Sequence, residues 1–396
     1  MPQRTRRVPP IWETPNSMDS VSIGQPRSIT SGNAKATFGS LEIGRFLAAS
    51  IVVLTHLMPE TAHYSLNGQT AIFGGYRPPG AFAVQYFFVL SGFVMMTAHR
   101  RDFGKLGAVP RFWWRRACRI YPAYWIALLI CLPYLYGSLT PVFSAKLLLL
   151  LPADTADWVP PAWSLHYEFT FYLMFGLCLL PYVGRPLLLV WVLALGWQWC
   201  PDGLRAILHL APPYELTSLS IRYISFFTAP FEFYFFAGLF GGWLFAVTKL
   251  RRYANIALCA AGVAILVAAL PYMSWGNAYG NPVVAPISGL GYAALIVGLA
   301  GLERNGVLRL DKKARWLGAI SYPLYILHTP LLLVFHSHAA VLKLPPVGLY
   351  VLFFLGCAAI YAIAAAVAFC IDQPLQRRLR RIFPRRPTAL RPVEQL

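Results

Sequence analysis

The sequence predicts an all-α polytopic membrane protein with about ten transmembrane helices and both termini in the cytoplasm. Three observations lead to this prediction: the composition, the succession of apolar segments and the distribution of basic residues. Of the 396 residues, 57% are hydrophobic and 12% are charged, whereas soluble domains carry roughly 25% charged residues. This composition argues against a water-soluble globule, and the many aromatic residues argue against a disordered chain.

Ten apolar segments, bounded by charged residues or by Pro and Gly, are the expected helices. A spanning helix needs about 20 mostly apolar residues, so the chain length accommodates about ten of them with their loops. The expected helices cover residues 46–58, 81–98, 120–137, 163–181, 186–201, 226–247, 254–272, 283–302, 317–336 and 347–371. The apolar run 142–151 is too short to span, so we expect it to be interfacial or re-entrant.

The positions of Lys and Arg test this arrangement. With ten spans, 29 of the 34 Lys and Arg residues fall on one side of the membrane and 5 on the other. Basic residues concentrate in cytoplasmic loops, so both termini are predicted to be cytoplasmic. The net charge of +19 then follows from topology and does not indicate a nucleic-acid partner.

The chain divides into one membrane domain and two tails. Residues 1–40 are polar and are expected to form a flexible cytoplasmic tail, 41–375 the ten-helix domain, and 376–396 a basic cytoplasmic tail. No internal repeat and no second, soluble domain is visible. The seven cysteines lack zinc-binding spacing and are interpreted as small hydrophobic residues. There is also no acidic cluster for a divalent ion, so no metal site is predicted.

Arg45 and His56 are ionisable residues on the first expected helix, where each needs a partner or a function. Eleven residues separate them, which places both on one helix face about 16 Å apart along the axis. Arg45 is expected at the cytoplasmic end and His56 near the outer end. The alternative is an interfacial, snorkelling arginine and a histidine hydrogen-bonded at the boundary.

Arg116 and Arg119 are expected at the cytoplasmic start of the third helix. They are three residues apart and share a face, and the start of a helix favours anions. This pattern indicates a phosphate site. Ordinary basic residues of a cytoplasmic loop are the alternative interpretation.

Four further polar residues are candidates within the predicted helices. Glu168 lies more than a turn inside the fourth helix, where a carboxyl can orient a catalytic histidine; a carboxyl at the outer interface is the alternative. Ser91, beside Gly92, is expected at mid-membrane, where helix packing is the more ordinary role. Tyr325 and His328 lie on the ninth helix, with His328 at a depth similar to His56.

Five of these segments, in this order, resemble the membrane-bound acyltransferase-3 family of bacterial glycan O-acyltransferases. They are Arg45 with His56 eleven residues further on, the FFVLSGF segment at 87–93, the segment RACRIYP at 116–122, WSLHYE at 163–168 and SYPLYILH at 321–328. The resemblance covers about 41–375. Two positions depart from the family pattern: Gln85, where an acidic residue is frequent, and His166, where a small residue is frequent. These departures concern the identity of the acceptor.

The resemblance implies transfer of an acyl group, most often acetyl from acetyl-CoA, to a sugar hydroxyl of an extracytoplasmic or lipid-linked glycan such as exopolysaccharide or O-antigen. His56 and Glu168 are then the expected catalytic residues. Arg45, Arg116 and Arg119 are expected to bind the donor, while Ser91, Tyr325 and His328 line the channel or stabilise an oxyanion.

The same resemblance sets the expected cofactors, partners and location. Acyl-CoA is a donor substrate, and no cofactor is permanently bound. The expected partners are acyl-CoA, a carbohydrate acceptor, the lipid bilayer and the polysaccharide synthesis machinery, with no nucleic acid. The expected location is the bacterial inner membrane.

Two other classes of protein fit parts of the pattern. A proton-coupled transporter or exporter also uses intramembrane His, Glu and Arg residues, although no inverted repeat and no pair of broken helices is visible. A non-catalytic scaffold for polysaccharide synthesis would leave this set of polar residues unexplained.

Overall fold

The computed structural model describes residues 38–66, 71–135, 145–150, 159–208, 226–272, 283–310, 312–339 and 342–383. These residues belong to one unit, Thr37–Leu396. Most of the predicted N-terminal tail and the end of the C-terminal tail lie outside the described residues. Of the expected interfacial run 142–151, only 145–150 is described.

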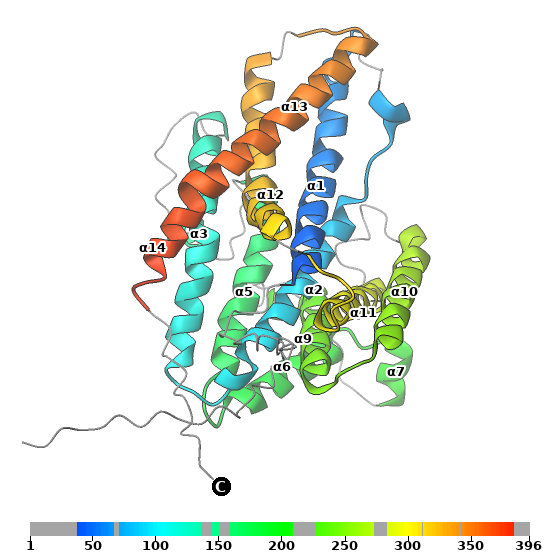
Figure 1. The fold of residues 1–396 in the computed structure, drawn as a ribbon, viewed down its shortest axis with the longest axis vertical. Helices are drawn as coiled ribbons and strands as arrows, with labels where there is room; N and C mark the ends of the chain where they lie inside the picture. The colour runs from blue at the N-terminus through cyan, green and yellow to red at the C-terminus, as the bar shows by residue number, and fades with distance from the viewer. Residues whose placement is uncertain are drawn as a thin grey trace, which may run out of the picture. The chain divides into compact units, whose positions relative to one another are not determined.

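The described residues form helices and no strand (Figure 1). The longer helices are α1 (Gly39–Ala62), α2 (Gly80–His99), α3 (Ala108–Leu135), α5 (Trp163–Cys178), α6 (Gly184–Gln198), α9 (Phe231–Val247), α10 (Arg252–Ala269), α11 (Val284–Arg304), α12 (Lys312–Ala339) and α13 (Pro346–Ala366). Shorter elements are η1 (Ile72–Gly75), η2 (Arg100–Asp102), α4 (Ala145–Leu148), η4 (Pro160–Ala162), α7 (Asp202–Ile207), η5 (Leu270–Tyr272), the π-helical η6 (Val367–Asp372) and α14 (Gln373–Leu379).

Each of the ten expected apolar segments overlaps one of the longer helices. Within the described ranges, 7 helices are long and apolar enough to cross a membrane. The helices α5, α6 and α9 have 16, 15 and 17 residues, which is short for a span of about 20. Over its described residues the chain is therefore all-helical, with several helices able to cross a membrane, as in a multi-pass membrane protein.

Helices α1 and α3 begin furthest ahead of the starts that the sequence predicted. A carboxylate of α11 caps α1, because Glu303 accepts hydrogen bonds from the backbone N–H groups of Gly39 (2.8 Å) and Ser40 (2.5 Å). The first N–H groups of a helix need such acceptors, so α1 extends to Gly39 and Arg45 lies inside it. Likewise α3 begins at Ala108, so Arg116 and Arg119 lie more than two turns inside it. The prediction that they sit at a helix start is wrong.

Helices α2 and α9 pack closely through glycine. A Cβ atom added to Gly92 would lie 2.1 Å from the Phe235 carbonyl oxygen, and one added to Gly238 would lie 2.0 Å from that of Val89. Small residues allow such close backbone approach in membrane helices. The packing role expected for the Ser91–Gly92 pair therefore belongs to Gly92, which leaves Ser91 to face elsewhere.

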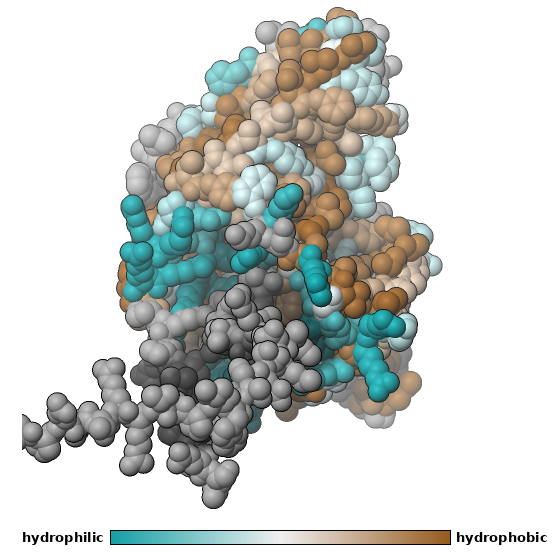
Figure 2. Space-filling view, viewed as in Figure 1, coloured by the Kyte–Doolittle hydropathy of each residue, from teal (hydrophilic) through white to brown (hydrophobic). Residues whose placement is uncertain are grey.

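Helices α1 and α12 are neighbours (Figure 1), and their interface carries most of the polar residues discussed below. The two helices run in the same direction, because contacts between them join residues 272 to 276 positions apart at successive levels. In the view of Figure 2, hydrophilic residues gather where α14 and α3 lie, whereas the surface over α13 is largely hydrophobic.

Candidate active site

The α1–α12 interface brings His56 and His328 together, two residues that are 272 positions apart. Nε2 of His328 lies 3.3 Å from Nδ1 of His56, and the ring centroids are 5.0 Å apart. His328 is fully buried, whereas His56 is exposed. We call these two residues the histidine pair.

Backbone carbonyls define which ring nitrogens of the histidine pair carry protons. Nδ1 of His56 lies 2.8 Å from the Val52 carbonyl oxygen, and Nδ1 of His328 lies 2.6 Å from that of Tyr325. A carbonyl only accepts, so both Nδ1 atoms carry protons in the neutral rings. Nε2 of His328 then accepts from Nδ1–H of His56. The lone pair of the His56 ring is consequently on its Nε2 atom, which is the nitrogen that can take up a proton.

Tyr325, one turn before His328, connects the histidine pair to α5. Its hydroxyl lies 2.6 Å from the Ser164 hydroxyl and donates to the Pro161 carbonyl at 3.2 Å. The ring of Phe87 on α2 packs against that of Tyr325 with centroids 5.7 Å apart. Tyr325 therefore holds α2, α5 and α12 together beside the histidine pair.

Glu168 lies one turn further along α5 than Ser164. Its Oε1 atom accepts a hydrogen bond from the Ser91 hydroxyl at 2.9 Å and another from the Tyr172 hydroxyl. No described hydrogen bond joins Glu168 to His56, whose orienting contacts come from Val52 and His328. A catalytic role for Glu168 thus stays a prediction, and its direct effect is to fix Tyr172.

Tyr172 links Glu168 to the arginines. The Arg116 guanidinium lies over the Tyr172 ring, 5.1 Å from its centroid, and over that of Phe112 at 5.6 Å. Both are cation–π distances. Sequence reasoning missed Tyr172, although its position four residues after Glu168 places the two on one helix face.

The predicted donor-binding arginines gather at the end of the interface where α1 begins. Arg45 forms an ion pair with Glu42 at 3.0 Å, and Arg119 lies within electrostatic range of Glu42. The charges of Arg116 and Arg119 both act on the Tyr172 hydroxyl. We call the group of Arg45, Arg115, Arg116 and Arg119 the basic end.

The C-terminal helix adds a further cation to the basic end. The indole N–H of Trp114 on α3 donates to the Leu379 carbonyl at 2.9 Å, which brings α14 against α3. Partial burial lowers the pKa of the Arg380 guanidinium, and the positive charges of Arg119 and Arg116 lower it further. The basic end therefore concentrates like charges that repel one another.

Some polar atoms at the basic end have no partner within the described part of the chain. The Nε atoms of Arg115 and Arg116 are buried there without a hydrogen bond. Asp372 is buried and accepts a hydrogen bond from Gln376 at 2.8 Å. Buried donors without acceptors are unfavourable, so an anionic ligand would complete this end of the site.

Two further polar residues lie outside both groups. Glu232 on α9 is fully buried, and neither carboxylate oxygen has a hydrogen-bond partner among the described residues; it belongs to neither the histidine pair nor the basic end. His166 on α5 lies 3.0 Å from the Leu150 carbonyl through its Nδ1 atom. Over the described ranges, no group of three potential metal-ligating side chains is present.

The fold and these sites define a multi-pass membrane protein with a buried histidine on one helix and a cationic region beside it. The chain matches the acyltransferase-3 family, described as an acyltransferase domain, over residues 38–369. It therefore belongs to that family, as the sequence motifs indicated.

Two named proteins are similar to this chain. The acyltransferase MdmB of Streptomyces mycarofaciens is 32% identical over 148 residues, which is 34% of this chain and 35% of MdmB. The exopolysaccharide production protein ExoZ of Rhizobium meliloti (strain 1021) is 27% identical over 266 residues, which is 63% of this chain and 76% of ExoZ. The match thus spans about a third of MdmB and about three quarters of ExoZ. No solved structure shows a significant match.

Proposed function

We propose that this protein transfers an acyl group, acetyl from acetyl-CoA, across the membrane to a sugar hydroxyl of an extracytoplasmic or lipid-linked glycan. One observation carries the proposal: His56 of the histidine pair and Arg45 of the basic end lie on the same helix, α1. The name of MdmB supports acyl transfer, and the name of ExoZ supports a polysaccharide acceptor such as exopolysaccharide.

The basic end is the proposed site for the nucleotide half of acyl-CoA. Arg45, Arg116 and Arg119 would pair with its phosphates, and the buried Nε atoms of Arg115 and Arg116 are donors that such an anion could satisfy. From Arg45 to His56 the helix rises about 16 Å. The slender pantetheine arm could span this distance, so the phosphates would not have to cross the hydrocarbon.

His56 is the proposed general base. Its Nε2 atom takes the proton of the acceptor hydroxyl while the hydroxyl oxygen attacks the thioester carbonyl carbon. The tetrahedral intermediate then collapses with cleavage of the carbon–sulfur bond, and the departing thiolate takes the proton back from His56. Val52 and His328 accept from Nδ1–H of His56 throughout, which stabilises the imidazolium form.

The remaining site residues support this reaction. Ser91 and Tyr325 are proposed to line the acyl channel or to donate to the developing oxyanion; to donate, each hydroxyl would exchange its present bond to Glu168 or to the Pro161 carbonyl for one to the oxyanion. Glu168 is proposed to act through Tyr172, which holds the Arg116 guanidinium in place. A covalent acyl-enzyme intermediate is the alternative chemistry for the same residues.

The proposed topology follows from the distribution of basic residues. Ten spans with both termini in the cytoplasm would place the basic end toward cytoplasmic acyl-CoA and the opposite end of α1 toward the glycan. The helices α5, α6 and α9 are then short spans. A bacterial inner membrane is the proposed location, and the polysaccharide synthesis machinery is a proposed partner.

Mass spectrometry of glycans from a deletion strain tests this function. Loss of a mass increment equal to one acetyl group, restored by the wild-type gene and not by His56→Ala, is the expected result. An unchanged glycan, together with loss of transport of a labelled solute, would overturn the proposal in favour of the transporter.

A further inference from the structure

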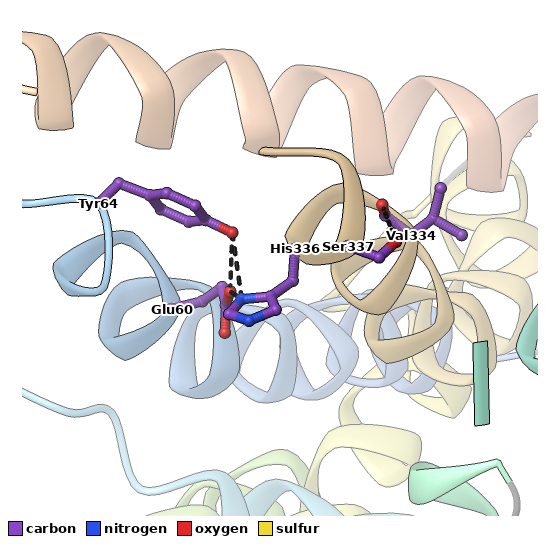
Figure 3. A network of polar contacts seen from close by, with 5 residues as sticks. All are labelled: Glu60, Tyr64, Val334, His336 and Ser337. Atoms are coloured by element: carbon purple, nitrogen blue, oxygen red, sulfur yellow. Dashed lines mark hydrogen bonds and ion pairs between the residues drawn. The ribbon is translucent and has the colours of Figure 1, made fainter. Parts of the chain in front are cut away.

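A second polar cluster joins α1 to α12 beyond the histidine pair, on the side away from Arg45. Nδ1 of His336 lies 2.8 Å from Oε1 of Glu60, and the Tyr64 hydroxyl donates to the same oxygen at 3.1 Å. Figure 3 shows the imidazole facing Glu60 and Tyr64, whereas Ser337 and Val334 interact with each other on another side of α12. We call Glu60, Tyr64 and His336 the Glu60 cluster; the histidine pair and the basic end include none of its members.

The Glu60 cluster follows the histidine pair along both α1 and α12, on the side away from Arg45. Glu60 follows His56 by four residues, so it lies on nearly the same face of α1, about 6 Å further along the axis. On α12, His336 is eight residues beyond His328. The two helices run in the same direction. Glu60 and His336 therefore make a second contact between α1 and α12, nearer to the C-terminal ends of both helices than the contact between His56 and His328. A ligand whose reacting atom is at His56 would extend past Glu60.

The cluster is held rigidly yet remains accessible. The backbone N–H of Leu344 donates to the Tyr64 carbonyl at 2.7 Å, and the N–H of Leu66 donates to the Leu344 carbonyl at 3.1 Å. These bonds tie the end of α1 to the segment between α12 and α13. The side chains of His336 and Glu60 are nevertheless 51% and 21% exposed, so a ligand from solvent can reach them.

The hydrogen-bonding pattern leaves Glu60 ready to accept. Burial and the adjacent Glu60 carboxylate raise the pKa of Tyr64, so its hydroxyl keeps its proton and donates. Within the described residues, the bonds to Glu60 from His336 and Tyr64 both end on Oε1. The second oxygen, Oε2, can therefore accept from hydroxyl groups of a ligand. An ionised acceptor forms the stronger class of hydrogen bonds.

We propose that the Glu60 cluster is a binding subsite for the acceptor sugar, in which Glu60 and His336 hold hydroxyl groups of the ring whose reacting hydroxyl is at His56. The axial separation of Glu60 and His56, about one helical turn, is comparable to the length of one sugar ring. The carboxylate favours an uncharged sugar, because an acidic sugar would be repelled. This assignment rests on the proposed function.

Steady-state kinetics with two varied substrates tests the subsite. The full chain, purified in detergent, is assayed with labelled acetyl-CoA and with the polysaccharide fraction isolated from a strain that lacks the gene. For Glu60→Gln and His336→Gln we expect the KM for this polysaccharide to rise at least about tenfold, as for a lost charge-assisted hydrogen bond. The KM for acetyl-CoA should change less than about twofold, which also shows that the variants are folded.

His338→Gln is the matched control. His338 is the next histidine on α12, but its Nδ1 atom lies 2.8 Å from the Val334 carbonyl and its ring packs against Tyr134. Its polysaccharide KM should equal that of the wild type. An unchanged polysaccharide KM in both Glu60→Gln and His336→Gln would overturn the subsite alone, as would a parallel change in both KM values. If the wild-type protein transfers no label to the polysaccharide, the proposed function fails and the subsite with it.

Discussion

The histidine pair and the basic end each contribute one residue to helix α1, His56 and Arg45, yet their polar groups are satisfied in different ways. At the histidine pair, both Nδ1 atoms face backbone carbonyls and the two rings contact each other. At the basic end, cations crowd together, and the Nε atoms of Arg115 and Arg116 are buried without a partner among the described residues. The protein itself satisfies the polar groups of the histidine pair, whereas at the basic end it leaves buried donors to which the proposed acyl-CoA phosphates could bind.

Replacing the proposed base should have the largest effect and separates the two regions most clearly. His56→Ala should lower kcat at least about 100-fold, since a positioned general base contributes roughly that much or more. Because the basic end is untouched, the affinity for acetyl-CoA should stay within about twofold. Label transfer and equilibrium binding of acetyl-CoA measure the two quantities. Wild-type transfer by His56→Ala would remove the base assignment.

Removing an arginine of the basic end should weaken acetyl-CoA binding more than it lowers kcat. Arg116→Ala and Arg119→Ala should each weaken acetyl-CoA binding about tenfold to 100-fold, the loss of a charge-assisted hydrogen bond to phosphate. Since the histidine pair is unchanged, kcat at saturating donor should fall much less. Arg251→Ala, an exposed arginine outside the site, is the control. If donor affinity is unchanged, the basic end does not bind phosphates.

The contact within the histidine pair can be tested by a buried substitution. His328→Phe keeps a ring of similar size and removes the acceptor nitrogen that faces Nδ1–H of His56. We expect kcat to fall about tenfold, roughly the value of one hydrogen bond, with no change in the KM for acetyl-CoA. A variant with full kcat would reduce His328 to a packing residue.

The smallest effect on catalysis is expected from a substitution between α2 and α9, which lie outside both the histidine pair and the basic end. Gly238→Ala would place a Cβ atom 2.0 Å from the Val89 carbonyl oxygen, so α9 must move away from α2. Overpacking of this kind costs about 1–3 kcal/mol, and it should lower the thermal unfolding temperature in detergent. Gly107→Ala is the control, because nothing lies within 4 Å of the added atom. Equal stability of the two variants would contradict the described packing.

The sequence located the helices well because each one is an uninterrupted apolar segment. All ten expected segments overlap a helix, but the starts of α1 and α3 were predicted too late. The start of α1 depends on Glu303, a residue more than 250 positions away, and no local pattern could indicate that cap. The number of spans is likewise open at α5, α6 and α9, because their lengths fall below that of an ordinary span.

The residue types of the site were also visible in the sequence, because an ionisable side chain in an apolar helix is unfavourable unless it has a partner or a function. The sequence did not show which of these residues contact one another. Glu168 was expected to orient a histidine, and it binds Ser91 and Tyr172 instead. Tyr172 was not anticipated, since a tyrosine inside an apolar helix is common without a functional role, and the Glu60 cluster was not, since Glu60 and Tyr64 lie near the end of α1 and their partner His336 is on another helix.

The helical class, the approximate positions of the helices, the family and the polar residues of the apolar segments could all be predicted from the amino-acid order. Those features depend on local composition and on spacing along one helix, which are fixed by the order of residues. The packing of the helices against one another, in contrast, is what brings His56 to His328, Glu60 to His336 and Arg116 over Tyr172. Each of these contacts joins different helices, and how two helices align depends on the packing of the side chains and glycines between them, which no single segment contains.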